Sequence, residues 1–215
     1  MMKNVLVIGM GRFGKYTARK LMELGYDVMA VDRHEERIEQ ILDEVTSARI
    51  GDATSEDFLR SLGIGDFDLC FVGVGDSFLE ALEITSLLKE LGAVRVISRA
   101  TSSTMEKFLL RNGADAVVFP ERQMAGWAAI RYSSDNILNY IDVSDGYSIY
   151  EVKIPDQWDG KRIDEIDVRK RYGVSILGIR NGKMTMNPPH DAVLYKENNM
   201  LVLGKNEELH RMFRI

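Results

Sequence analysis

A glycine-rich turn stands between the first apolar run of the chain and its first amphipathic segment. Residues 5–8 (VLVI) are continuously apolar and mostly β-branched, as in a parallel strand buried on both faces. The G-x-G-x-x-G hexapeptide that follows directly is Gly9-Met10-Gly11-Arg12-Phe13-Gly14. In this context the motif gives a tight turn, lets the backbone approach a pyrophosphate, and opens a helix whose N-terminus favours anions. The sequence therefore predicts a nucleotide-binding loop followed by a helix over residues 13–24.

Short apolar runs alternate with helical segments through the first 120 residues. One helical segment, residues 77–91, begins with Ser77 and Glu80 in an S-x-x-E capping pattern, and Gly92 ends it. The apolar runs lie at residues 5–8, 28–31, 45–50, 69–72, 94–97 and 116–119. Six strands with helices between them predict an α/β fold, a Rossmann-type doubly wound parallel sheet.

The pattern changes after Pro120. Residues 121–140 carry no strand-like run and have apolar positions at helical spacing, which predicts one long helix or a broken helix pair. The rest resembles an antiparallel module with a tight Asn181-Gly182 turn and a helical segment at 164–172. Its strands are expected at 147–154, 175–180, 183–186 and 200–203. The chain thus divides into a nucleotide-binding domain (1–120), a crossover or linker helix (121–142) and a small α+β domain (143–215).

Composition excludes several classes of protein. Lys and Arg number 28 and Asp and Glu number 33, a net charge of −5, which argues against a generic binder of nucleic acid. The single cysteine, Cys70, lies in an apolar run and is expected to be a buried, inert thiol. No apolar run reaches the roughly 18 residues of a membrane span, and the first residues do not resemble a signal peptide, so we expect a cytoplasmic protein.

Candidate ligand-binding residues follow the second and third predicted strands. Asp32, 18 residues after Gly14, is placed to accept hydrogen bonds from a ribose diol. Arg33 could pair with the 2′-phosphate of NADP, but Asp32 would repel that phosphate, so an adenosine ligand with a free 2′-hydroxyl is the simpler interpretation. Arg33 is then expected to be a solvated surface charge. Asp52 and Ala53 end the third strand beside the expected adenine pocket. There Asp52 could contact the base edge or cap the helix that starts near Ser55.

Arg12 is an unusual residue for a dinucleotide-binding loop. A fixed cation there suits a third phosphate better than a diphosphate, although a surface arginine at a helix start is the alternative. The three histidines lack acid partners or metal-ligand spacing, and no nucleophile motif is present. Tyr16 and Lys20 match Y-x-x-x-K, but they lie in the helix after the glycine loop rather than beside a nicotinamide. A nucleotide site without catalytic residues suggests a sensor and not an enzyme.

Taken together, these motifs resemble a known family. The segments that carry the resemblance are residues 7–14 (VIGMGRFG), 31–32 (VD), 51–54 (GDAT), 119–121 (FPE) and 136–142 (NILNYID). They look like RCK proteins (regulators of K⁺ conductance), the cytosolic gating subunits of bacterial Ktr/Trk potassium uptake systems. The single pair of lobes is similar to the Ktr subunit more than to the duplicated Trk one.

The resemblance implies an architecture and an assembly. A Rossmann-type RCK N-lobe would be followed by a crossover helix and a small C-lobe. Homodimers would form through the crossover helix and assemble into an octameric ring. This ring would lie at the inner face of the cell membrane, beneath a separate channel or transporter subunit of the KtrB/TrkH type.

The resemblance also implies ligands. ATP and ADP would compete for the Rossmann site, and NAD(H) binds some members; Asp32 would hold the ribose and Arg12 the γ-phosphate. Glu121 would help coordinate a divalent cation, Mg²⁺ or Ca²⁺, because a carboxylate near triphosphates is repulsive without one. The alternative for Glu121 is a first-turn glutamate favoured by the helix dipole. Some Ktr subunits bind cyclic di-AMP at the C-lobe, where Ile163, Arg169 and Pro188-Pro189 occupy comparable places, although the loop at 181–187 departs from the known forms.

Two hypotheses of different classes follow. The first is a nucleotide-sensing regulatory subunit of a potassium uptake system, in which ATP and ADP favour different ring shapes. The second is an NAD(P)(H)-binding oxidoreductase or an NAD-sensing Rossmann protein, against which the lack of a placed proton donor counts.

Overall fold

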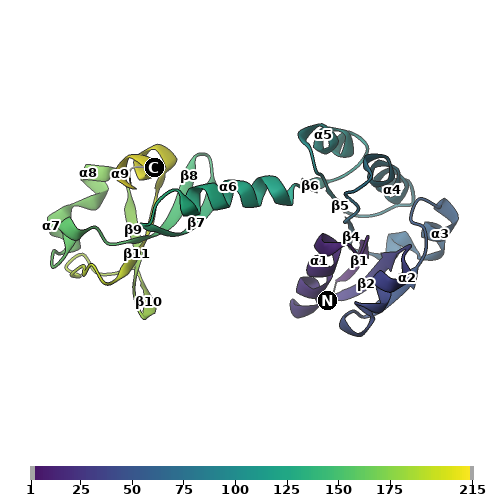
Figure 1. The fold of residues 1–215 in the computed structure, drawn as a ribbon, viewed down its shortest axis with the longest axis horizontal. Helices are drawn as coiled ribbons and strands as arrows, with labels where there is room; N and C mark the ends of the chain where they lie inside the picture. Colours follow the sequence, from purple (N-terminus) through teal and green to yellow (C-terminus); the bar gives the residue numbers. More distant parts are fainter. Residues whose placement is uncertain (1–2, 214–215) are drawn as a thin grey trace. The chain divides into compact units, whose positions relative to one another are not determined.

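The computed structural model describes residues 3–213, which fall into two compact units that divide between Glu121 and Arg122 (Figure 1). Each unit has its own sheet and its own core. No helix in the described part of the chain is both long enough and apolar enough to cross a membrane.

The first unit is built on a six-stranded parallel sheet in the order β3-β2-β1-β4-β5-β6. This order confirms the predicted doubly wound sheet, because the chain moves outward from β1 in one direction and then returns to continue from β4 in the other. The strands are β1 (Asn4–Ile8), β2 (Asp27–Asp32), β3 (Ser47–Ile50), β4 (Leu69–Val72), β5 (Val96–Arg99) and β6 (Ala116–Val118).

Helices cover both faces of this sheet, and the residues of β1 alternate between the two faces. Leu6 and Ile8 belong to one buried cluster with Leu59 and Ile84, whereas Val5 and Val7 belong to the other with Ala18, Leu21 and Ile38. The continuous apolar run of β1 is thus explained by burial on both sides. The helices of this unit are α1 (Arg12–Glu23), α2 (Glu35–Glu39), α3 (Glu56–Ser61), α4 (Phe78–Glu90) and α5 (Ser103–Arg111), with short 3₁₀ turns at Leu42–Glu44 and Ile64–Asp66.

The second unit carries a five-stranded antiparallel sheet in the order β10-β9-β11-β8-β7. Its core contains Tyr150, Trp158, Met200 and Phe213. The strands are β7 (Ile137–Ser144), β8 (Tyr147–Lys153), β9 (Ser175–Asn181), β10 (Lys183–Met186) and β11 (Asn199–Lys205). The helices are α6 (Pro120–Tyr132), which begins in the first unit, α7 (Ile163–Ile166), α8 (Val168–Tyr172) and α9 (Asn206–Phe213), with a 3₁₀ turn at Asp156–Trp158.

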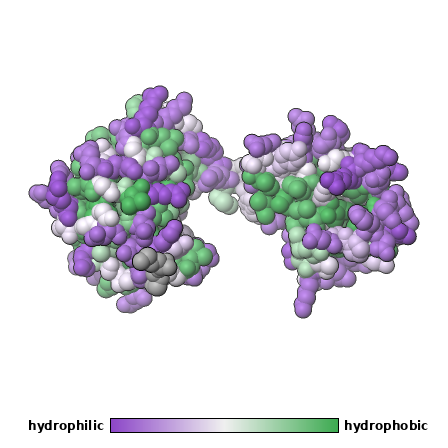
Figure 2. All heavy atoms as spheres, turned by 180° about the vertical axis from the view of Figure 1, so that it is seen from behind, coloured by the Kyte–Doolittle hydropathy of each residue, from purple (hydrophilic) through white to green (hydrophobic). Residues whose placement is uncertain are grey.

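Alternate residues of this sheet differ in burial. In β8 the side chains of Ser148, Tyr150 and Val152 are buried, while those of Ile149 and Glu151 between them are half-buried. The half-buried apolar positions contribute to the hydrophobic surface of this unit, and Figure 2 shows a broad hydrophobic area on it.

The predicted helix over residues 121–140 is wrong beyond Tyr132. Residues 137–144 form β7, which pairs with β8 across a turn in which Asp145 (φ 52°) and Gly146 (φ 77°) both have positive φ. An Asp-Gly pair with this conformation is typical of a two-residue hairpin turn, and it decides for strand over helix. Ile137 and Tyr140 have a spacing that also fits a helix. In the structure Ile137 pairs with Val152 of β8, and its side chain is fully buried. The division into 1–120, 121–142 and 143–215 remains a proposal.

The second predicted turn differs in detail. Gly182 has φ 66°, whereas Asn181 is not among the described residues with positive φ and belongs to β9, where it pairs with Lys183. The positive φ therefore falls on the glycine alone, which carries no steric cost there.

Candidate nucleotide-binding site

A cavity of about 1100 Å³ opens at the carboxyl ends of the strands of the first unit. It is lined by the glycine loop after β1, the end of β2, and the loops that follow β3 and β4. β1 and β4 are neighbours whose connections leave in opposite directions, and in such sheets ligands bind at this point.

The three motif glycines have different physical roles. Gly9 has φ 91° and donates its N–H to the carbonyl of Val31 at 2.7 Å, which fixes the turn out of β1. A Cβ on Gly14 would lie 1.9 Å from the carbonyl oxygen of Gly9, so only glycine fits at this contact between helix and turn. Gly11, the N-cap of α1, has nothing within 4 Å of a built Cβ and makes no side-chain cap. The first-turn N–H groups of α1 are therefore left for a bound anion.

Asp32 ties the end of β2 to the glycine loop. Its carboxylate accepts hydrogen bonds from the backbone N–H groups of Met10 (2.7 Å) and His34 (2.9 Å). The His34 ring nitrogen lies 2.8 Å from Oδ1 and Arg37 donates to Oδ2 at 3.3 Å. Burial raises the pKa of Asp32, but these hydrogen bonds and the charge of Arg37 outweigh it and lower the pKa below its ordinary value. A ribose diol that bonds to Asp32 would have to replace the contacts of the His34 and Arg37 side chains, which are 54% and 41% exposed.

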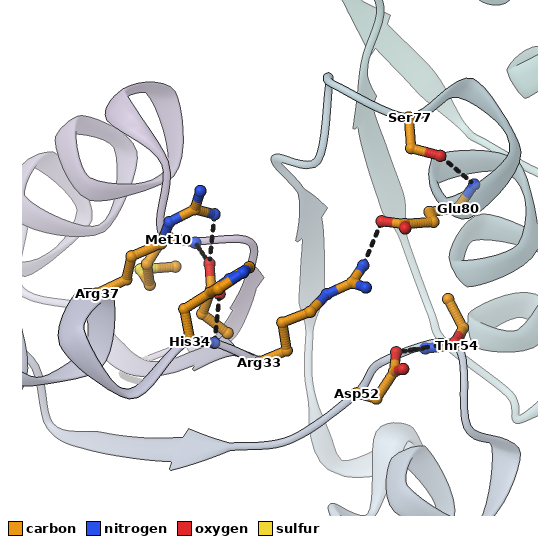
Figure 3. Close-up of polar contacts among 9 residues, drawn as sticks. Met10, Arg33, His34, Arg37, Asp52, Thr54, Ser77 and Glu80 are labelled. Atoms are coloured by element: carbon orange, nitrogen blue, oxygen red, sulfur yellow. Dashed lines mark hydrogen bonds and ion pairs between the residues drawn. The ribbon is translucent and has the colours of Figure 1, made fainter.

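Arg33 reaches across the cavity instead of standing alone in solvent. Its guanidinium forms an ion pair with Glu80 on α4, and Figure 3 shows the two side chains meeting between the elements. The arginine side chain is still 41% exposed, as a surface residue would be. Ser77 accepts a hydrogen bond from the N–H of Glu80, as predicted. The Glu80 carboxylate pairs with Arg33 instead of bonding back to the backbone of Ser77, so the capping box is not completed.

Asp52 does not cap the next helix. It accepts hydrogen bonds from the N–H (2.9 Å) and hydroxyl (2.8 Å) of Thr54, and these lower the pKa of Asp52. Ser55 is the N-cap of α3 and accepts from the N–H of Phe58. Asp52 therefore shapes its own loop beside the cavity, and Ala53 is buried next to it. The capping interpretation is wrong because the helix begins one turn later than the carboxylate can reach.

Arg12 and Phe13 both line the cavity at the start of α1. The Arg12 side chain is exposed, and its guanidinium makes no hydrogen bond or ion pair within residues 3–213. Phe13 is half-buried, and the guanidinium carbon of Arg99 lies 5.8 Å from the centre of its ring. A cation at this position is available for an anionic ligand.

Sequence reasoning missed several residues that the fold brings to the cavity. Arg99, the last residue of β5, donates from Nη2 to Glu121 Oε1 at 2.6 Å, and both residues line the cavity. The loop after β4, with Gly73 and Gly75, forms another wall. These residues follow strands β4 and β5, so the rule that ligands bind at the carboxyl ends of parallel strands was the signal that could have found them.

Comparison with known proteins places the chain. Residues 5–120 match the TrkA-N domain and residues 148–215 the TrkA-C domain. The chain is 34% identical over 212 residues to Ktr system potassium uptake protein C of Bacillus subtilis, covering 98% of this chain and 96% of that one. It is 35% identical over 210 residues to Ktr system potassium uptake protein A of the same organism, covering 97% and 95%. The chain belongs to the TrkA family of potassium uptake proteins.

Solved structures agree with this family assignment at the level of the fold. The GsuK RCK domain matches 100% of this TrkA-family chain and 47% of its own, with TM-score 0.69 and 20% identity. The GsuK channel bound to NAD matches 97% and 38% (TM-score 0.68, 19% identity), and GsuK bound to ADP matches 63% and 36% (TM-score 0.54, 16% identity). The TrkA-family chain thus spans less than half of the GsuK chain, and the likeness confirms the Rossmann-type RCK fold.

Glu121 is paired with an arginine and belongs to no cluster of metal-ligating side chains within residues 3–213. Its carboxylate is bound to Arg99, and the described residues contain no group of three or more acidic, histidine or cysteine side chains that could hold an ion. The backbone N–H of Glu121 and the Arg99 hydrogen bond lower the pKa of Glu121. Coordination of a divalent cation by Glu121 remains a prediction.

The residues compared with a cyclic di-AMP site lie in the second unit. The N–H of Ile163 bonds to the carbonyl of Ala192 (3.0 Å), and that of Asp164 to the carbonyl of His190 (2.9 Å). The start of α7 is therefore next to the loop that follows Pro188-Pro189. Arg169 is exposed on α8.

Cys70, the cysteine of β4 in the first unit, is buried. Burial raises the pKa of its thiol to about 12, which agrees with an inert thiol.

Proposed function

We propose that this chain is the nucleotide-sensing regulatory subunit of a potassium uptake system and acts on a separate membrane subunit. The observation that carries the proposal is the cavity of the first unit, where the glycine loop presents the open N-terminus of α1 and Arg12 beside an ionised Asp32. Its full-length similarity to the two Bacillus subtilis Ktr proteins supports the potassium uptake system as the context.

The proposed role is regulatory and not catalytic. Three carboxylates of the cavity hold structural contacts: Asp32 bonds to the glycine loop, Asp52 bonds to Thr54, and Glu80 is paired with Arg33. Such a cavity selects a ligand by shape and charge, and a ligand with differential affinity for two conformations shifts the population between them. ATP and ADP are the proposed pair, because Arg12 supplies a cation beyond the position of a diphosphate.

Arg12→Ala is expected to lower the preference for ATP over ADP by about tenfold. A hydrogen bond to a charged group contributes about 1.5–3 kcal/mol, and Arg12 would make it only with the third phosphate. Isothermal titration calorimetry with ATP and with ADP, on wild type and variant, measures this preference directly.

Arg19→Ala is the matched control, since Arg19 lies on the same helix, pairs with Glu44 and does not line the cavity. It should keep the wild-type preference. An Arg12→Ala protein with an unchanged ratio of ATP to ADP affinity would contradict the assignment of Arg12. NADH is titrated in the same series: if NADH alone binds the wild type, the NAD-sensing alternative replaces the ATP/ADP switch.

We also propose that the chain dimerises through α6. None of the 13 residues of this helix is buried, and its exposed side chains include Met124 (57%) and Tyr132 (74%). A helix with unburied apolar side chains usually has a partner, and a second copy of the chain is the proposed one.

Met124→Lys is therefore expected to shift the protein from dimer or larger assembly to monomer, as measured by size-exclusion chromatography with light scattering. Leu24→Lys is the control, because Leu24 is similarly exposed (62%) but follows α1. A Met124→Lys protein with the wild-type mass would contradict dimerisation at this surface.

The mass that light scattering gives for the wild type also tests the proposed octameric ring. The position at the inner face of the membrane and the membrane partner are testable by co-purification, and cyclic di-AMP at the second unit by direct titration.

A further inference from the structure

Arg99 is held in the cavity by three different elements. Its Nη2 donates to Glu121 on α6, and its guanidinium carbon lies 5.8 Å from the centre of the Phe13 ring on the glycine loop. The absence of a side chain on Gly75 makes room for it, because a Cβ there would lie 2.7 Å from Arg99 Nη1. The Arg99 side chain is only 19% exposed, so contacts with other residues fix its position.

The hydrogen-bonding capacity of Arg99 is largely unused. A guanidinium has five N–H donors in a planar fork, and the structure gives one of them, on Nη2, to Glu121. The Nε atom is buried and has no hydrogen-bond partner within residues 3–213. A buried donor without a partner is uncommon, and the Arg99 side chain that carries it lines a cavity whose glycine loop suits an anion. A phosphate can accept two bonds from such a fork.

Glu121 competes for the same cation. Its side chain is 56% exposed, and its carboxylate would repel a polyphosphate in the cavity. Glu121 is also in the first turn of α6, the helix that begins in the first unit and continues into the second. Whatever releases Glu121 from Arg99 therefore changes the start of the segment that joins the two units.

We propose that Arg99 is a second phosphate-binding cation, and that a bound polyphosphate displaces Glu121 from it and so loosens the first turn of α6. This inference rests on the proposed nucleotide-binding function. It adds the residue pair through which a nucleotide bound in the cavity would change the contacts of α6. Because the Glu121 carboxylate repels a polyphosphate held by the same guanidinium, the Arg99–Glu121 ion pair and phosphate binding oppose each other, which is the differential interaction that a two-state switch requires.

The test is titration calorimetry with ATP in EDTA, without any divalent cation. Arg99→Gln is expected to weaken ATP binding about tenfold, because a charge-assisted bond is lost. Glu121→Gln is expected to tighten it about threefold to tenfold, because the competing carboxylate is gone. A role of Glu121 in cation coordination alone predicts no change in EDTA. Arg95→Gln is the matched control: Arg95 is an exposed arginine four residues earlier that does not line the cavity, so it should bind like wild type.

Amide hydrogen exchange gives a second readout. ATP should speed exchange of the first hydrogen-bonded amides of α6, residues 124–127, in wild type but not in Arg99→Gln. Arg99→Lys, which keeps the charge and loses the fork, should bind with intermediate affinity and covers the case in which Arg99→Gln does not fold. Wild-type affinity in Arg99→Lys and Arg99→Gln, or no tightening in Glu121→Gln, would overturn the inference while leaving nucleotide binding intact. Failure of the wild type to bind any nucleotide would instead overturn the proposed function itself, and the inference with it.

Discussion

Gly14→Ala is expected to abolish nucleotide binding and to lower the free energy of unfolding of the first unit by about 3 kcal/mol. A methyl group at this position would lie 1.9 Å from the carbonyl oxygen of Gly9, far inside contact distance, and the atom it meets is backbone. Neither a rotamer change nor a flexible neighbour can relieve the overlap, so α1 must move away from the turn after β1. That movement separates the helix N-terminus from the phosphate position. Urea unfolding and calorimetry with ATP measure the two effects.

Gly11→Ala is the matched comparison in the same loop. A Cβ there has nothing within 4 Å and φ is −69°, so the change should leave stability within about 0.5 kcal/mol of wild type. The methyl group would nevertheless stand where a pyrophosphate approaches the backbone, and we expect at least tenfold weaker ATP binding. If Gly11→Ala and Gly14→Ala were equally destabilising, the separate roles assigned to the two glycines would be wrong.

Tyr150→Ala is expected to cost the second unit about 3–5 kcal/mol of folding free energy. The side chain is fully buried at the centre of the core. It makes an edge-to-face contact with Tyr140 (ring centres 5.3 Å apart) and stacks with Phe213 at 6.5 Å. Its removal leaves a cavity that the surrounding strands cannot close. Peptide-resolved hydrogen exchange measures the loss in β8 and β11, where protection should fall most.

Tyr150→Phe separates packing from hydrogen bonding. The Tyr150 hydroxyl lies 3.2 Å from His210 Nε2, and burial raises the pKa of the phenol to about 12, so it stays protonated near neutral pH. Losing this hydrogen bond while keeping the ring should cost about 1 kcal/mol. A loss as large as that of Tyr150→Ala would show that the hydroxyl, and not the ring, carries the stability.

The helix-to-strand error after Tyr132 shows where sequence patterns fail. Ile137 and Tyr140 are three residues apart, a spacing that a helix places on one face and that β7 also accommodates, with a register shift between residues 137 and 139. Pairing with β8 decided between them, and such pairing depends on a segment farther along the chain. By contrast, β1 was predictable, because burial on both faces imposes a continuous apolar run.

The sequence by itself determined the alternation of strands and helices in the first unit, the glycine loop and the place of Asp32 at the end of β2, since each is read from residues close together in the chain. The tertiary structure alone decided which cations meet which carboxylates. Arg99 and Glu121 are 22 positions apart and Arg33 and Glu80 are 47 apart, and they pair because the strand order brings the carboxyl ends of β2, β4 and β5 around one cavity. Local conformational preferences carry no information about such distant pairs. Their contacts form only when the strands have paired and the sheet has folded.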